Sequence, residues 1–132
     1  MKKNTKLFSL FSFLLFVDQA LKHFADIVSC NKNLAWSIPI VPAIFYLVWT
    51  AIIAVLIYVF FKTKKYSRKI FLIFVFSGAI SNLIDRIRLG CVVDYIDIKI
   101  FPVFNLGDVY ITIGVIMLVI KILKNKSREA TL

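Results

Sequence analysis

Four long apolar stretches, separated by polar segments, dominate the pattern of this 132-residue chain. An α-helix needs about 20 predominantly apolar residues to cross the hydrocarbon core of a bilayer. The pattern therefore predicts four membrane-spanning helices, which we place at about 7–28, 38–61, 70–86 and 105–123. Together they use most of the chain, so we expect residues 1–132 to form a single integral membrane domain.

Two local features lie in and after the third apolar stretch. Ser77, Gly78 and Ser81 are small residues at helical spacing, which lets another helix approach closely within a membrane. Residues 92–98 alternate loosely between apolar and polar and are rich in β-branched side chains. That second pattern predicts a short strand on the outer surface.

The charges divide between the two ends of the predicted helices. The net charge is +10, and the lysines and arginines gather before the first stretch, in the loop at 62–69 and after the fourth stretch. This is the positive-inside pattern, so we expect both termini in the cytoplasm and no nucleic-acid partner. Six of the seven acidic residues are aspartates at or between the other ends: Asp18, Asp26, Asp85, Asp94, Asp97 and Asp108.

The cysteines and the histidine add little chemistry. A cleaved leader ending before Cys30 is disfavoured, because polar and charged residues interrupt the stretch that precedes it. Cys30 and Cys91 both fall in predicted outer segments, where a disulfide can form in an oxidising compartment. Two cysteines do not establish a bond, and we expect two free thiols. His23 is the single histidine, so we predict neither a metal site nor a cofactor.

Polar clusters at the ends of apolar stretches are the candidate functional site, because an ionised carboxylate near hydrocarbon is costly. Asp18 and Lys22 are four residues apart and share a helical face. They are interpreted equally well as a buried pair that fixes helix packing or as a direct contact to substrate. Two carboxylates that different helices bring together can share one proton and activate water.

Two further clusters end the third stretch and open the fourth. Asn82 and Arg86 are four apart, and Arg86 could either extend to the interface or orient a carboxylate or substrate. Asp85 beside it could be only an interfacial charge. Asn105 fits a helix N-cap and Asp108 a first-turn acid. Those structural roles explain one polar cluster. They do not explain why two clusters meet on the same side of the membrane, so the pattern favours a functional site.

Four blocks of this sequence resemble, in order and internal spacing, the signature blocks of lipoprotein signal peptidase (signal peptidase II). They are Asp18-Gln-x-x-Lys22, Gly78-Ala-Ile-Ser-Asn82-Leu-Ile-Asp85-Arg86, Gly90-x-Val-Val-Asp94-Tyr-Ile-Asp97 and Phe104-Asn105-x-x-Asp108. The resemblance extends from Asp18 to about Gly114. It implies an all-α protein of four transmembrane helices in the bacterial inner membrane, with a small β-rich cradle on the outer face.

The resemblance also implies an activity: an aspartyl endopeptidase that removes signal peptides from prolipoproteins, cleaving before the diacylglyceryl-modified cysteine. Asp94 and Asp108 would be the catalytic pair. The supporting or substrate-binding residues would be Asn82, Arg86, Asn105, Asp18, Lys22 and Asn31. The partners would be prolipoproteins and membrane lipids, and the protein would act as a monomer without a metal. One departure is Asn33, which stands where the family usually has glycine, although Asn31 and Trp36 agree.

Two other classes of function are alternatives for a chain with four apolar helices. A small four-helix multidrug or ion transporter needs an acid near the middle of the membrane. Here the acids gather at one face, and Asp18, the one candidate, has Lys22 a turn away as an internal cation. A catalytically inactive relative that acts as a membrane interaction protein is the other alternative. The presence of both Asp94 and Asp108 disfavours it.

Overall fold

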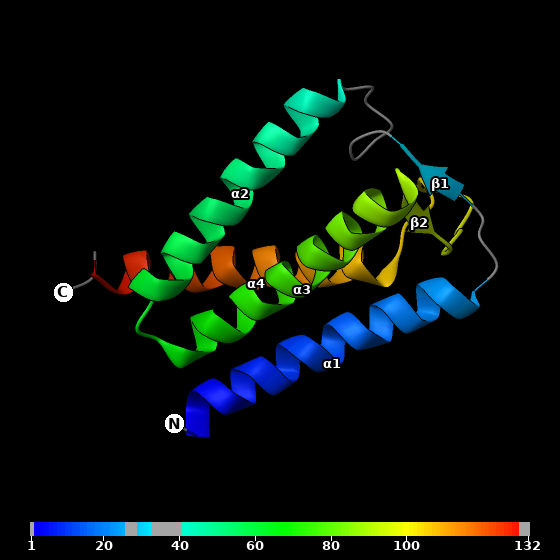
Figure 1. Cartoon of the computed structure of the whole chain (residues 1–132). Coiled ribbons are helices and arrows are strands. Elements are labelled where there is room, and N and C mark those ends of the chain that lie inside the picture. The colour runs from blue at the N-terminus through cyan, green and yellow to red at the C-terminus, as the bar shows by residue number, and fades with distance from the viewer. Residues whose placement is uncertain (1, 26–28, 33–40, 130–132) are drawn as a thin grey trace.

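The computed structural model describes residues 2–25, 29–32 and 41–129, so Asp26, Asn33 and Trp36 lie outside the described residues. Its elements follow in the order shown in Figure 1. They are α1 (Lys2–Phe24), β1 (Ser29–Asn31), α2 (Pro42–Lys62), α3 (Tyr66–Leu89), β2 (Val92–Asp94) and α4 (Leu106–Glu129). In the described part of the chain, four helices are long and apolar enough to cross a membrane.

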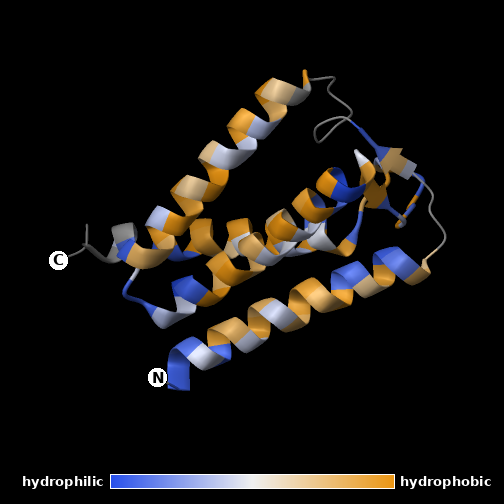
Figure 2. Ribbon diagram, viewed as in Figure 1, coloured by the Kyte–Doolittle hydropathy of each residue, from blue (hydrophilic) through white to orange (hydrophobic). Residues whose placement is uncertain are grey.

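The prediction of four apolar helices is confirmed, but their ends differ from those expected. The first helix begins at Lys2 and ends at Phe24, whereas the sequence suggested about 7–28. The third and fourth helices extend over Tyr66–Leu89 and Leu106–Glu129, beyond 70–86 and 105–123. Figure 2 shows hydrophilic residues at both ends of α1 and apolar residues along its middle. Hydropathy detects only the apolar part, whereas helical hydrogen bonding continues into the polar ends.

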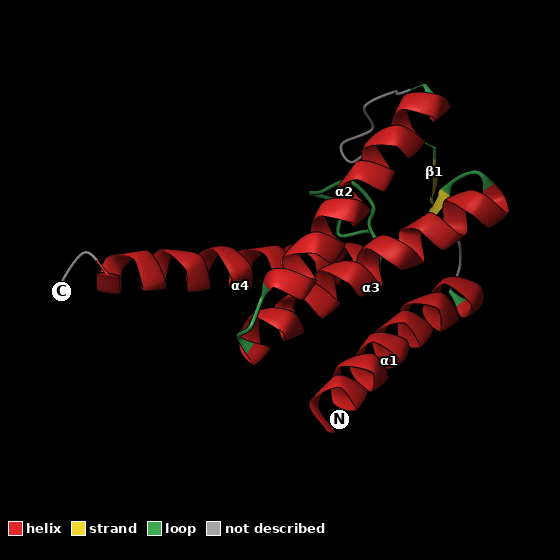
Figure 3. Cartoon of the chain, turned by 60° about the vertical axis from the view of Figure 1, so that its left-hand side comes forward, coloured by secondary structure: helices red, strands yellow, loops and turns green. Residues whose placement is uncertain are grey.

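Helix α3 is the central element, and it packs against both α4 and α1 (Figure 3). The backbones of α3 and α4 approach so closely at Gly78 that an added Cβ would overlap the carbonyl oxygen of Gly107. At Gly114 an added Cβ would lie 2.7 Å from the carbonyl oxygen of Phe71. The expected close approach at the small residues of the third stretch is therefore confirmed.

The apolar core lies between α1, α3 and α4. Leu7, Leu14, Ile73 and Tyr110 form one buried cluster, and the Phe74 ring meets the Tyr110 ring edge-on. Helix α2 is different, because its apolar side chains are exposed along most of its length. It lies near α3 at the turn that joins the two helices and diverges from the other helices toward its N-terminal end (Figure 1). Such exposed apolar surface is suited to contact with lipid.

A two-stranded antiparallel sheet follows the polar end of α3. Gly90 ends that helix with a φ of 74°, which a glycine adopts without strain. Strand β2 then pairs with β1 in the register Ser29↔Asp94, Cys30↔Val93 and Asn31↔Val92. The predicted strand is therefore present over Val92–Asp94 only, shorter than the expected 92–98, and a small sheet lies at the end of the helices. Further along, Ile96 bridges to Phe104.

Cys30 and Cys91 form a disulfide, so the expectation of two free thiols is wrong. Their Cα atoms lie 5.4 Å apart, although 61 residues separate them in the chain. The pairing of β1 with β2 brings the two residues together. The sequence contained both cysteines but not the strand register, and the register determines whether two cysteines can reach each other.

Candidate active site

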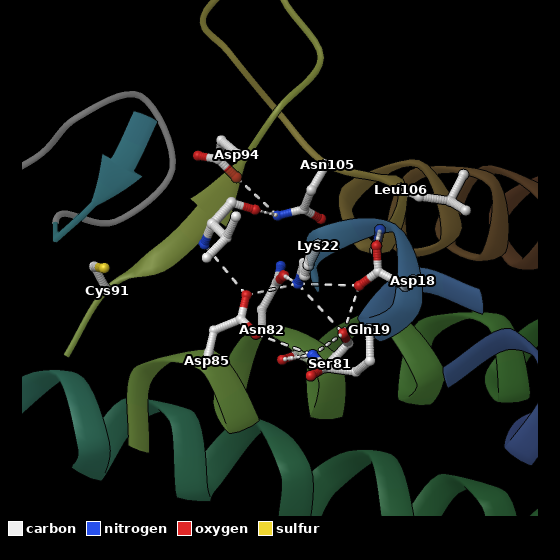
Figure 4. A network of polar contacts seen from close by, with 12 residues as sticks. Asp18, Gln19, Lys22, Ser81, Asn82, Asp85, Cys91, Asp94, Asn105 and Leu106 are labelled. Carbon is white, nitrogen blue, oxygen red and sulfur yellow. Dashed lines mark hydrogen bonds and ion pairs between the residues drawn. The ribbon is translucent and has the colours of Figure 1, made fainter. Parts of the chain in front are cut away.

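The polar residues of the predicted site gather where α1, α3, β2 and the start of α4 meet (Figure 4). Asp18 and Asn105 are completely buried there, and Asp94 is 3% exposed. Asn82 and Lys22 are also buried. Such groups must find partners within the protein, because water cannot satisfy them. The structure therefore brings together side chains that the sequence placed in three separate clusters.

Lys22 is the centre of this network. Its Nζ lies 3.0 Å from Asp18 Oδ2 and 2.8 Å from Asp85 Oδ2. It also donates to Asn82 Oδ1 at 2.8 Å and to Ser81 Oγ at 3.3 Å. A buried ammonium is tolerated when carboxylates and further acceptors surround it. The predicted pairing of Asp18 with Lys22 is confirmed, and the pair also joins α1 to α3.

Asp85 has a larger structural role than the sequence suggested. It is 4% exposed, so the interpretation as a mere interfacial charge is wrong. Besides Lys22, its carboxylate accepts from Gln19 Nε2 at 2.9 Å and from the Val93 N–H at 3.2 Å. The Val93 bond ties α3 to strand β2, one residue before Asp94. No local pattern in the sequence distinguishes Asp85, because its partners Gln19 and Lys22 lie on α1.

Two asparagines hold the two carboxylates of the predicted catalytic pair. Asn82 Nδ2 donates to Asp108 Oδ1 at 2.9 Å. Asn105 Nδ2 donates to Asp94 Oδ1 at 2.7 Å, and its Oδ1 accepts from the Asp108 N–H at 3.0 Å. The Asn105 N–H donates in turn to Asp108 Oδ2 at 3.2 Å. Asn105 thus acts as the helix cap expected from the sequence and also joins Asp94 to Asp108.

The electrostatic environment of Asp94 is unusual for a carboxyl group. Burial, together with the charge of Asp108, raises the pKa of Asp94 to about 6. Hydrogen bonds from Asn105 and Asn31 and the charge of Lys22 act in the opposite direction on this pKa. A carboxyl group with a raised pKa beside a second carboxylate is an arrangement that can supply an acid and a base together.

Arg86 and Asn31 complete the surroundings of Asp94. The Arg86 guanidinium lies 4.3 Å from the ring centroid of Phe45 on α2. Its charge also interacts with Asp94 and Asp108. These contacts favour the interpretation in which Arg86 orients carboxylates. Asn31 contacts Asp94 from β1. All eight predicted site residues therefore belong to this network.

The start of α4 is held by side chains from other elements. The Gly107 N–H donates to Asp18 Oδ1 at 2.9 Å. The Leu106 N–H donates to the Tyr95 hydroxyl at 3.3 Å. Burial raises the pKa of Tyr95 to about 12, so its hydroxyl remains protonated and can donate to Asp18. The sequence does not predict this role of Tyr95, because no sequence pattern shows where its ring lies.

The fold and the site together define a class of protein. The helices are long and apolar enough to cross a membrane, and a buried group of carboxylates and amides lies at one end of them. Among the described residues, no group of three or more His, Cys, Asp or Glu side chains could hold a metal ion. This is a multi-pass membrane protein with a polar site built around two asparagine-bound carboxylates.

Comparison with known proteins identifies the family. The family model described as signal peptidase (SPase) II matches residues 20–124. A lipoprotein signal peptidase of Staphylococcus aureus (strain Newman) is 39% identical over 119 residues, covering 84% of this chain and 73% of the relative. The chain belongs to the signal peptidase II family, and it is therefore a protease.

Solved structures agree with this assignment. A bacterial membrane enzyme solved by the in meso method at 2.3 Å superimposes with a TM-score of 0.83 and 29% identity. That match covers 94% of this chain and 91% of the other. A second bacterial membrane enzyme, solved at 1.9 Å, has a TM-score of 0.78 and 30% identity over 91% of this chain and 94% of the other. The predicted fold class, a four-helix membrane protein with a small sheet, is therefore confirmed.

Proposed function

We propose that this protein removes signal peptides from bacterial prolipoproteins and that Asp94 and Asp108 are its catalytic aspartyl pair. Cleavage would occur before the diacylglyceryl-modified cysteine. The observation that carries the proposal is the position of Asn105, which donates to Asp94 and accepts from the Asp108 backbone. Asn105 thereby contacts the Asp94 carboxylate with its side chain and the Asp108 carboxylate with its backbone N–H. Family membership supports the substrate class.

The proposed chemistry uses one proton shared by the pair, because two adjacent carboxylates do not both ionise cheaply. Asp94, with a pKa of about 6, is assigned the proton. Asp108, which accepts from Asn82 and from the Asn105 N–H, is assigned the role of base. The base takes a proton from water, the water attacks the scissile carbonyl, and Asp94 donates to the developing oxyanion. Asp108 then passes its proton to the leaving amine while the collapsing gem-diol returns a proton to Asp94, which completes cleavage without a metal or a covalent intermediate.

The location of the site fits a substrate that is itself anchored in lipid. The described aspartates lie at or beyond one end of the helices, and the basic loop at 62–69 lies at the other. By the positive-inside rule, we place the site at the outer face of the cytoplasmic membrane. The acyl chains of the substrate would then stay in the bilayer while its peptide reaches the carboxylates. We further propose a single-domain monomer that is surrounded by lipid.

The proposal is tested by cleavage with purified protein in detergent, using a diacylglyceryl-modified prolipoprotein. Wild type is compared with Asp94→Asn and Asp108→Asn, and with Asp97→Asn as a matched control. Asp97 lies in the same outer segment but pairs with the exposed Lys99 at 2.6 Å. We expect cleavage by wild type and by the control, and none by the two site variants.

Two outcomes would contradict the proposal. If folded wild type cleaves none of several modified prolipoproteins, the peptidase assignment to this chain fails. Proton-coupled transport, measured in vesicles with Asp18→Asn as the comparison, would then be the next assay. If either site variant retains full activity, the protein is a peptidase but Asp94 and Asp108 are not its catalytic pair.

A further inference from the structure

Tyr95 follows Asp94 directly and holds the chain on both sides of Asn105. Its backbone N–H donates to the carbonyl oxygen of Phe104 at 3.2 Å. Its hydroxyl accepts from the Leu106 N–H at 3.3 Å. Phe104 and Leu106 are the two neighbours of Asn105, whose side chain donates to the Asp94 carboxylate (Figure 4) and accepts from the Asp108 N–H. One tyrosine therefore fixes the peptides before and after the residue that couples the pair.

The same hydroxyl belongs to the group of acceptors that cover the start of α4. The first N–H groups of a helix have no partner within the helix, and leaving them unpaired is costly away from water. Here the Leu106 N–H is accepted by Tyr95, the Gly107 N–H by Asp18 and the Asp108 N–H by Asn105. The Tyr95 hydroxyl also interacts electrostatically with the Asp18 carboxylate, so two of these three acceptors are coupled to each other.

We infer that the Tyr95 hydroxyl is a positioning group for the reaction: it fixes the start of α4 and, through Asn105, the relative placement of Asp94 and Asp108. The inference rests on the proposed function, because it assumes that these carboxylates are catalytic. The hydroxyl itself accepts from the Leu106 N–H and interacts with Asp18. It therefore acts through other residues and is not a catalytic residue itself.

The test is Tyr95→Phe, which removes the hydroxyl and keeps the ring. Loss of one neutral hydrogen bond should lower kcat between about twofold and tenfold, with KM unchanged. A matched control is Tyr66→Phe, the same change at the opposite end of α3, where the Tyr66 ring lies beneath Lys3. The control should leave both kcat and KM at the wild-type values.

The pH dependence of kcat distinguishes a positioning role of the Tyr95 hydroxyl from a role in fold stability alone. The hydrogen bond from Asn105 lowers the pKa of Asp94, so a loosened Asn105 should let this pKa rise. The alkaline limb of kcat, where Asp94 loses its proton, should then move to higher pH in Tyr95→Phe. The other groups that face Asp94 are unchanged in this variant; they are Asp108 on α4, Lys22 on α1, Arg86 on α3 and Asn31 on β1.

A second variant removes the same bond from the donor side. Leu106→Pro deletes the N–H that the hydroxyl accepts, at the first helical position, where proline is tolerated. We expect the same fall in kcat and the same shift of the alkaline limb. This variant replaces Tyr95→Phe as the test if the latter does not accumulate in a folded form.

The possible results separate failure of this inference from failure of the proposed function. A wild-type kcat and profile in Tyr95→Phe would overturn the inference, and so would a lower melting temperature with an unmoved pH profile. Failure of the inference differs from failure of the proposed function. In the first case wild type cleaves and Asp94→Asn does not, whereas in the second case wild type itself does not cleave.

Discussion

Replacing Asp94 with asparagine should abolish cleavage and, at neutral pH, stabilise the folded protein. Burial raises the pKa of Asp94 from an ordinary 3.8 to about 6. At 1.36 kcal/mol per pKa unit, this difference corresponds to about 3 kcal/mol between the protonated and ionised forms. Asparagine resembles the protonated acid and can still accept the hydrogen bond from Asn105. The variant therefore avoids the cost of ionising a buried carboxylate.

The sign of the effect follows from linkage between proton binding and folding. A pKa that is higher in the folded state means that the folded state binds the proton more tightly than the unfolded state. The resulting stabilisation is fully present below the unfolded pKa of about 4 and is lost as the pH rises through about 6. Asp94→Asn should therefore match wild type near pH 4. It should exceed wild type by up to about 3 kcal/mol above pH 7.

The assay is the free energy of unfolding in mild detergent, measured at several pH values between about 4 and 8 for wild type and variant. Asp97→Asn is the control, because Asp97 pairs with exposed Lys99 and hydrogen bonds from Lys99 lower its pKa. Its contribution has the opposite sign and is lost as the pH falls, so its replacement should not stabilise the protein. The reasoning would be refuted if Asp94→Asn were less stable than wild type at pH 7. It would also be refuted if the two proteins differed by the same free energy of unfolding at every pH.

Three further predictions concern stability, measured by unfolding in detergent. Lys22→Met should destabilise the protein by about 3–5 kcal/mol, because two buried carboxylates lose their cation; a neutral outcome would show that the network is not charged. Gly78→Ala should cost about 1–3 kcal/mol by pushing the backbones of α3 and α4 apart, because the added Cβ would overlap the Gly107 carbonyl oxygen. An unchanged free energy of unfolding would exclude close packing at this position. Cys30→Ser combined with Cys91→Ser should cost about 2–4 kcal/mol, and dithiothreitol should mimic it in wild type only.

The parts of the fold that sequence alone predicted are those that depend on local pattern. Apolar stretches located the helices, since a membrane helix satisfies its own backbone and needs only an apolar surface. Helical spacing also indicated that Asp18 pairs with Lys22, and the cap position indicated how Asn105 bonds to Asp108. These features involve residues close together in the chain, whose relative positions follow from helix geometry.

The parts that sequence missed depend on how distant segments meet. The sequence does not show that α1 covers Asp85 with Gln19 and Lys22, so it predicts only an interfacial charge there. The Cys30–Cys91 bond depends on a strand register that no local pattern fixes. Long-range pairings of this kind are set by tertiary packing, which a single sequence does not display.

The polar network that holds the proposed catalytic pair also holds the fold together, and this has an evolutionary consequence. Asp18 and Lys22 join α1 to α3, and Asn105 begins α4. Selection for folding alone would therefore preserve these residues even in a lineage with no need for cleavage. Asp94 differs, because its ionised form is costly in the folded protein. Relatives that have lost activity should keep the network and show substitutions first at the position of Asp94.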